Sequence, residues 1–380
     1  MPTRDITLGE LRGYAVSRTL FRPTTLQRAI DTLGFVQADP IRAPARAQDL
    51  TLRHRVATYR AGDLERRYSR LAVEEDFFIN YGFLPRRFQT LMHPRSAVRP
   101  WTPARKRRAL AILDFVRERG SVHPREVDEH FAHGTVTNYW GGASSATTQL
   151  LDSMHYRGLL RVVRRDNGIR VYAAHEHAPG PSNATERRAT LDALVDVVVR
   201  KYAPLPATSL GVVVRRLRYA APQLARGIDA ALARAKQRLA HSRIAGVEWY
   251  WPADEQPAVL RDWFDDQVRL LAPFDPIVWD RRRFELLWGW PYRFEAYNPP
   301  SKRRFGYYAL PLLWRDSAIG WANVSVKKGE LAAEFGYVAQ APRERAFRRE
   351  LDAEMDRMRA FCGSDSNSAR SVASAMPLKR

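Results

Sequence analysis

An Asn-Gly dipeptide at positions 167 and 168, placed between two apolar segments, constrains the fold of this chain more than any other feature. Asn-Gly strongly favours the two-residue turn of a β-hairpin, so Leu159–Arg164 and Ile169–Ala173 are predicted to be paired strands. Apolar residues at helical spacing predict three helices upstream, over Ala104–Arg119, Pro124–Phe131 and Ala146–Tyr156. Three helices followed by a hairpin form a winged helix, whose third helix enters a DNA groove.

The same order recurs further along the chain. Helical periodicity covers Glu186–Tyr202, Thr208–Leu217 and Ile228–Ala240, and a strand-like segment follows at Ile244–Trp251. We therefore predict winged helices over residues 101–178 and 185–265. Residues 1–100 begin with two amphipathic helices, the second ending at Gly34, and are interpreted as a divergent first winged helix.

The pattern changes to short alternating strands after residue 271. Five such strands are expected, at Phe284–Trp288, Tyr292–Tyr297, Phe305–Leu312, Ala318–Val326 and Leu331–Tyr337. They predict a small β-barrel over residues 271–340, followed by a charged helix over 341–362 and a disordered tail over 363–380. The fold class is thus α+β and mainly α, with three tandem winged helices and a C-terminal β-barrel.

The charge of the chain points to a polyanionic partner. Its 380 residues include 62 Lys and Arg against 41 Asp and Glu, a formal net charge of +21, which favours nucleic acid. The single cysteine, Cys362, excludes disulfides within the chain and any cysteine-based zinc site. Because no run of 18 apolar residues occurs, we expect a cytoplasmic, nucleoid-associated protein with no membrane contact.

The segment Gln37-Ala38-Asp39 is the candidate for chemistry. In an extended strand, residues two apart project from one face, so the amide and the carboxylate would lie together. Such a pair can hold a water molecule and stabilise a developing cation, the two tasks in hydrolysing a glycosidic bond. The alternative is structural, because Asp39-Pro40 is also a common way to open a turn.

Several further motifs, in order along nearly the whole chain, resemble those of the YcaQ-type winged-helix DNA glycosylases. They are Gln37–Asp39 with Ala45–Ala47, Tyr139–Ser144 running to His155–Gly158, Arg164–Gly168, Ala272–Pro276, Trp279–Arg283 and Lys302–Tyr308. The resemblance implies three winged helices and a barrel around duplex DNA, with Gln37 and Asp39 as the catalytic pair. The Gln-x-Asp form resembles members that act on N7-alkylated purines and interstrand crosslinks.

The resemblance also suggests how the residues would divide the work. Asp39 would stabilise the oxocarbenium-like sugar and accept a proton from water, while Gln37 orients that water. An N7-alkylguanine is already cationic, so its departure needs no general acid. No lysine lies in or near the motif in the sequence to form a Schiff base, and we therefore expect a monofunctional enzyme. We expect a monomer that acts without a metal or an organic cofactor.

The family pattern has His and Glu at two positions where this chain carries Ile79 and Asn80. This departure predicts a shifted substrate range or a loss of activity. The second hypothesis is therefore a non-enzymatic winged-helix DNA-binding protein, such as a regulator or a damage-recognition factor. Residues expected to contact DNA under either hypothesis are Arg46, Arg55, Thr147, Thr148, Gln149, Arg164, Arg165, Arg170, Lys302, Arg303 and Arg304.

Overall fold

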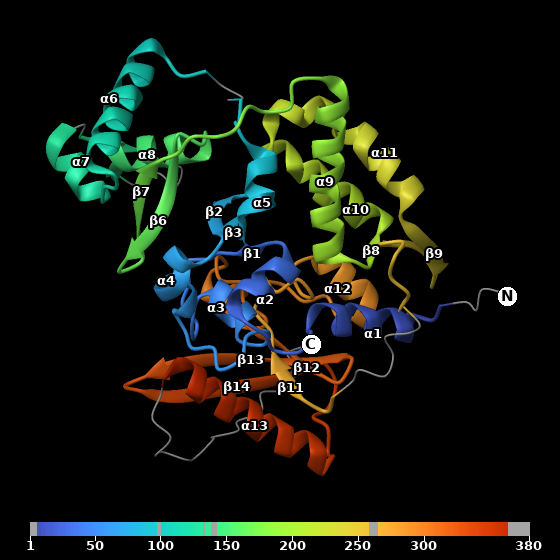
Figure 1. Ribbon diagram of the computed structural model, residues 1–380. Coiled ribbons are helices and arrows are strands. Elements are labelled where there is room, and N and C mark those ends of the chain that lie inside the picture. Colours follow the sequence, from blue (N-terminus) through green and yellow to red (C-terminus); the bar gives the residue numbers. More distant parts are fainter. Residues whose placement is uncertain (1–5, 97–99, 132–133, 138–142, 258–264, 364–380) are drawn as a thin grey trace. The chain divides into compact units, whose positions relative to one another are not determined.

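The structure is a computed structural model that describes residues 6–96, 100–131, 134–137, 143–257 and 265–363 (Figure 1). It contains two compact units, each built from separate stretches of the chain. Unit 1 comprises residues 1–63, 198–212 and 236–380, and unit 2 comprises residues 64–197 and 213–235. The sequential division into winged helices, predicted from the sequence, stays a prediction.

Unit 1 begins with the two helices expected from the sequence, α1 (Leu8–Thr19) and α2 (Leu26–Leu33). Thr7 and Glu10 form a capping box at the start of α1, and the Thr25 side chain caps α2. Gly34 ends α2 in the left-handed conformation, with φ 68°, which a residue with a side chain adopts at a cost. This turn leads the chain directly into the short strand β1 (Val36–Gln37).

The C-terminal part of unit 1 is an open antiparallel sheet rather than the predicted barrel. Four strands lie in the order β11 (Val268–Leu270), β12 (Leu310–Trp314), β13 (Ser317–Lys327) and β14 (Glu330–Tyr337). The helix α13 (Arg345–Cys362) covers the β11 edge (Figure 1). Glu354 accepts a hydrogen bond from the Leu270 amide at 2.9 Å, and Arg357 donates to the Val268 carbonyl at 3.0 Å. Side chains of α13 thus satisfy an edge that a barrel would have paired.

Two of the five predicted strands are wrong. The segment read as Phe284–Trp288 belongs to the helix α12 (Arg281–Trp288), which Asp280 caps at its start and the left-handed Gly289 ends. Tyr292–Tyr297 is irregular backbone, and a carboxylate side chain within it bonds to another loop. Glu295 accepts hydrogen bonds from the backbone amides of Arg304 and Phe305 at 2.8 and 2.7 Å.

An apolar core joins α1, α12 and this sheet within unit 1. Its buried members are Val16, Leu20, Leu271, Ile277, Val278, Phe284, Trp290, Tyr292, Phe305, Ala309, Leu313 and Trp321. Five of these twelve side chains are aromatic, and large rings bury much apolar surface. The loop from 271 to 280 is therefore held by its own buried side chains, which fixes the position of Trp279 at its end.

Unit 2 contains the hairpin of β2 (Val73–Phe77) and β3 (Tyr81–Pro85), flanked by α4 (Asp63–Arg67) and α5 (Arg86–Gln89). The predicted order of three helices and a hairpin then follows: α6 (Pro103–Arg119), α7 (Pro124–Phe131), α8 (Ala146–Tyr156), β6 (Leu160–Asp166) and β7 (Ile169–Ala174). Asn167 and Gly168 form the expected turn, both with positive φ. A short pair, β4 (Thr135–Thr137) and β5 (Ala143–Ser145), lies between α7 and α8.

The second predicted group of helices is α9 (Ala184–Tyr202), α10 (Ala207–Ala220) and α11 (Ile228–Arg238). The predicted strand Ile244–Trp251 contains β10 (Val247–Trp251), which pairs with β9 (Ala240–Ile244) in a hairpin and also with β8 (Leu205–Pro206). The expected order of elements is present twice, while the winged-helix assignment itself stays a prediction. Positions 139–142 of the Tyr139–Ser144 motif and the predicted tail beyond 363 lie outside the described residues.

Candidate active site

The candidate motif, Gln37-Ala38-Asp39, lies at the end of β1 in unit 1. Phe35 and Val36 are fully buried, while 5% of Gln37 and 8% of Asp39 is exposed to solvent. The strand ends at Gln37, so Asp39 follows it in irregular backbone, contrary to the extended strand predicted through both residues. One oxygen of Asp39 accepts a hydrogen bond from the Ile41 amide at 2.9 Å, so the turn predicted as the alternative also forms.

Asp39 carries a charge that the described protein does not neutralise. Burial raises the pKa of its carboxyl, and only the hydrogen bond from the Ile41 amide lowers it. Within the part of the chain that the structure describes, none of the ion pairs involves this carboxylate. A buried carboxylate without a cation is a strong base and a good partner for a positive charge that arrives with a substrate.

The side chain of Gln37 is bonded to Trp279. The indole nitrogen of Trp279 lies 2.8 Å from the side-chain oxygen of Gln37. The ring of Tyr202 packs on that indole, with 4.8 Å between ring centroids and 31° between the planes. The motif is thus completed by residues more than 160 positions away in the chain, which no local pattern around Gln37 could indicate.

Lys201 is a site residue that the sequence did not reveal. Its side chain is 3% exposed and its ammonium group donates a hydrogen bond to the Phe35 carbonyl. Burial, with a smaller contribution from the nearby Arg55, lowers the pKa of Lys201 from 10.5 to about 7. The expectation that no lysine lies near the motif is therefore wrong in space, although it holds along the sequence.

Arg55 lies inside unit 1 rather than on a DNA-facing surface. It is completely buried, and its guanidinium group forms a two-pronged ion pair with Asp275 at 2.8 and 3.0 Å. The same group donates to the carbonyls of Thr19 and Thr51. Arg55 has no surface from which to contact a phosphate, which corrects its assignment as a DNA ligand. Its partner Asp275 instead anchors the loop that ends at Trp279.

The predicted DNA contacts in unit 1, namely Arg46 and the basic loop Lys302–Arg304, differ in their exposure to solvent. Lys302 and Arg304 are exposed, whereas Arg303 is half-buried, donates to the Asn298 carbonyl at 2.8 Å and stacks on Tyr307. Arg46 is half-buried where α3 (Ala47–Leu52) begins. These positions leave Lys302 and Arg304 as the side chains of this loop that are open to a phosphate.

In unit 2, the predicted recognition helix exposes only part of its predicted face. Thr147 is completely buried, Gln149 is half-buried and Thr148 is exposed. The burial of Thr147 corrects its assignment as a DNA ligand, because position 147 on α8 faces the interior.

The basic residues of the β6–β7 hairpin are already engaged with acidic or phenolic groups. Arg165 is ion-paired with the buried Glu75, Arg170 with Asp152, and the more exposed Arg164 with Asp166. Arg170 also lies over the Tyr81 ring. Of the three, Arg164 is the one whose side chain is largely open to solvent.

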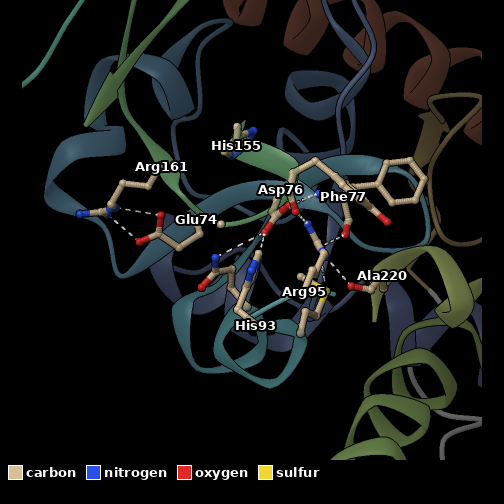
Figure 2. A network of polar contacts seen from close by, with 12 residues as sticks. Glu74, Asp76, Phe77, His93, Arg95, His155, Arg161 and Ala220 are labelled. Atoms are coloured by element: carbon tan, nitrogen blue, oxygen red, sulfur yellow. Dashed lines mark hydrogen bonds and ion pairs between the residues drawn. The ribbon is translucent and has the colours of Figure 1, made fainter. Parts of the chain in front are cut away.

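Three consecutive buried acids on β2 connect the β2–β3 hairpin to the rest of unit 2. Figure 2 shows Asp76 between His93 and Arg95, at 2.7 Å from each, and Glu74 held by Arg161. Although burial raises the pKa of Asp76, the Arg95 charge and the His93 hydrogen bond outweigh it and hold that pKa well below its usual range. This network is structural, because its charges compensate one another within the unit.

The same hairpin carries the departure from the family pattern. Ile79 is completely buried, and its carbonyl accepts a hydrogen bond from Arg216 at 3.1 Å. Asn80 uses its side-chain oxygen locally, on the Tyr81 amide at 2.9 Å. Neither residue supplies an imidazole or a carboxylate at these positions.

A second basic surface lies on α6 and was not among the predicted contacts. Arg105, Lys106, Arg107 and Arg108 are all exposed in its first turns. No ion pair involves these four side chains within the described ranges, and burial together with the Arg105 charge lowers the pKa of Arg157. The unbroken Arg-Lys-Arg-Arg run was the signal available in the sequence.

Comparisons with known proteins identify the family of the chain. The family model described as DNA glycosylase AlkZ-like matches residues 30–361, a span that includes Gln37, Asp39, Lys201 and Trp279. The chain belongs to this family. The AlkZ-like family is described as one of DNA glycosylases, enzymes that hydrolyse N-glycosyl bonds, so the chain is assigned to the DNA repair glycosylases.

A solved structure of this kind shares the fold. The DNA glycosylase AlkZ of Streptomyces sahachiroi matches with a TM-score of 0.62 and 13% sequence identity, over 98% of this chain and 100% of that chain. The AlkZ-like fold therefore extends across nearly the whole chain. No helix among the described residues has the length and apolar character needed to cross a membrane.

Proposed function

We propose that this glycosylase excises cationic N7-alkylated purines from duplex DNA, with Asp39 and Gln37 as its catalytic residues. One observation carries the proposal: the Asp39 carboxylate is buried and forms no ion pair with the described residues of a protein of net charge +21. A negative charge kept free of cations in so basic a chain suits a substrate whose positive charge moves to the sugar as the bond breaks.

The proposed step is a hydrolysis that balances without a general acid. The bond between C1′ and N9 breaks, and its electron pair goes to N9, which neutralises the cationic base as it leaves. Water attacks C1′, and its proton passes to the Asp39 carboxylate. The raised pKa of Asp39 makes it a stronger base for this transfer. Gln37 orients the water, and the products are an abasic site and a neutral alkylpurine.

An exposed aromatic side chain beside Asp39 supports a cationic base as the substrate. Tyr297 is 72% exposed, and its pKa is raised by partial desolvation and by the charge of Asp39. Its ring packs edge-on against Phe294, with 5.9 Å between centroids. The face of a tyrosine attracts cations, so Tyr297 can stack on an alkylated purine more favourably than on a neutral one. Crosslinks joined through N7 carry the same charge and belong to the proposed substrate class.

The exposed polar side chains are proposed to hold the DNA backbone. They comprise Arg105–Arg108 on α6, Thr148 on α8, Arg164 on β6, and Lys302 and Arg304 in the loop before Phe305. We also propose that the enzyme is monofunctional, because the ammonium group of Lys201 is buried against the Phe35 carbonyl. A Schiff base with the sugar would require that amine to reach the surface.

The test uses a duplex with a single N7-methylguanine, incubated with purified protein and then treated with alkali to cleave abasic sites. Wild-type protein is expected to give strand breaks at the lesion, and Asp39→Asn is expected to give none while binding the same duplex. A crosslinked duplex joined through N7 is run in parallel. Absence of breaks with both substrates, with tight binding intact, would refute the proposed activity.

The second candidate is a member of the same family that binds DNA and has lost turnover, and the residues at 79 and 80 favour it. The buried Ile79 and the locally bonded Asn80 replace the His and Glu of the family pattern. The same assay separates the two functions, because a binder retains affinity in both wild type and Asp39→Asn and releases no base from either.

A further inference from the structure

We propose that Trp279 is a positioning residue that fixes the side-chain amide of Gln37 in one of its two orientations. Gln37 then acts as a hydrogen-bond donor to the water, and Asp39 alone accepts the proton. This inference rests on the proposed function, because it assigns separate roles to the two residues of the same site.

The argument starts from the chemistry of the indole. A tryptophan side chain has one polar group, an N–H, which donates and cannot accept. The atom of Gln37 that lies 2.8 Å from it must therefore be the carbonyl oxygen. An amide has its two ends nearly identical in shape, and a hydrogen-bond partner of known sense is what distinguishes them. With the oxygen engaged, the NH2 group is the end left for a ligand.

Trp279 is itself held firmly from several directions. Its backbone amide donates to the Asp275 carbonyl at 2.8 Å, and the Asp275 carboxylate is locked by the buried Arg55. Tyr202 packs on the indole ring. The backbone hydrogen bond fixes the position from which the side chain extends, and the Tyr202 ring limits rotation of the indole, so its N–H is directed before substrate binds.

The end of α9 supports the motif at two points. Lys201 bonds to the Phe35 carbonyl, two residues before Gln37, and Tyr202 packs on the ring that bonds to Gln37 itself. Arg283 ties the same helix end to the loop, since it donates to the carbonyls of Tyr202, Pro276 and Ile277. The end of α9 and the loop that carries Trp279 therefore position both the backbone and the side chain of Gln37.

The orientation decides what each residue can do with the water. An NH2 group donates to the water oxygen and leaves both water protons available, so one of them can pass to Asp39. A carbonyl turned toward the water would instead compete with Asp39 for that proton. The indole N–H thus selects the arrangement with one donor and one base.

The first experiment replaces Trp279 with Phe, which removes the N–H and keeps an aromatic ring. Single-turnover base release from N7-methylguanine duplex is expected to slow by about 3- to 10-fold, the scale of one neutral hydrogen bond, with unchanged DNA affinity. The matched control is Trp288→Phe, which removes an indole hydrogen bond to the Asp316 carbonyl in the same unit. This control is expected to keep the wild-type rate.

Two further variants separate positioning from general support of the fold. In a Gln37→Ala background, Trp279→Phe is expected to cause no further loss of rate, because its target is gone; an undiminished loss would overturn the proposal. Gln37→Glu retains an oxygen for the indole but has no NH2 group, so it is expected to be as slow as Gln37→Ala. A Gln37→Glu rate within about 3-fold of wild type would also overturn it.

A spectroscopic measurement tests the hydrogen bond without using activity. Protein labelled with ¹⁵N in its ten tryptophans gives indole N–H resonances that Trp279→Phe and Trp288→Phe identify. Gln37→Ala is expected to move the Trp279 resonance and not that of Trp288, and an unmoved Trp279 resonance would overturn the proposal. If wild-type protein releases no base, the proposed function fails, yet this measurement still decides the amide orientation.

Discussion

The buried lysine beside the motif makes a quantitative prediction about stability and pH. Replacing Lys201 with Met removes a group whose pKa falls from 10.5 to about 7 on folding. Above pH 7 the folded protein has lost that proton while the unfolded chain still binds it. The free energy of unfolding rises with pH wherever the unfolded state binds more protons. The free energy of unfolding of wild type should therefore increase relative to that of Lys201→Met as pH increases from 7 toward 10.

The magnitude follows from the shift. One proton of difference corresponds to at most about 1.4 kcal/mol per pH unit, and the whole shift to at most about 5 kcal/mol. Losing the hydrogen bond to the Phe35 carbonyl adds a constant, independent of pH, to the difference in free energy of unfolding between wild type and the variant. The slope of the difference, rather than its value at one pH, therefore reports Lys201.

The assay is guanidinium unfolding of wild type and Lys201→Met between pH 6 and 9.5, comparing midpoints where the two m-values agree. Lys327→Met is the control, because that side chain is exposed at the end of β13. A wild-type advantage that stays flat or declines above pH 7 would refute the argument that Lys201 is desolvated in the folded protein.

Three other results are expected. Arg55→Met should lower the free energy of unfolding by about 3–5 kcal/mol, because it leaves the buried Asp275 carboxylate without its cation; denaturant titration measures this, and a decrease below about 1 kcal/mol would contradict it. The rate of base release should rise with pH through the pKa of Asp39, above the ordinary value for an aspartate, since the ionised form is the base; an acid limb at or below the ordinary value would argue against its burial. Arg107→Ala with Arg108→Ala should weaken binding to damaged and intact duplexes alike and reduce the slope of log affinity against log salt by about 1 for each phosphate that these arginines neutralise; an unchanged slope would place DNA elsewhere.

The site shows how a short motif depends on distant parts of the chain. Residues 35–39, the end of α9 and the loop from 275 to 283 meet in unit 1, with contacts at Phe35, Gln37 and Trp279. Three buried cations, Lys201, Arg55 and Arg283, lie in this region, and burial lowers the pKa of Arg283 to about 10. Their interactions are with backbone carbonyls and Asp275, which keeps them off the Asp39 carboxylate.

The local signals in the sequence were strongest where a single residue decides the backbone. Gly34 ends α2, and Asn167 and Gly168 form the hairpin turn, both as expected. The same type of signal was missed at Asp280 and Gly289, which cap α12, because alternation of apolar residues was read as a strand. The predicted barrel was wrong for a related reason: β11 is closed by polar groups of α13, which hydrophobic patterning does not show.

The sequence by itself determined the family, the basic charge, the end of α2 at Gly34 and the identity of Gln37 and Asp39 as the candidate pair. Only the tertiary structure decided what surrounds them. Whether an arginine faces DNA or an internal carboxylate, as Arg55 does, depends on burial and on a partner 220 positions away. The same holds for the indole that directs Gln37 and for the proton affinity of Lys201. Desolvation and hydrogen-bond partners are properties of the folded environment, and residue type alone does not carry them.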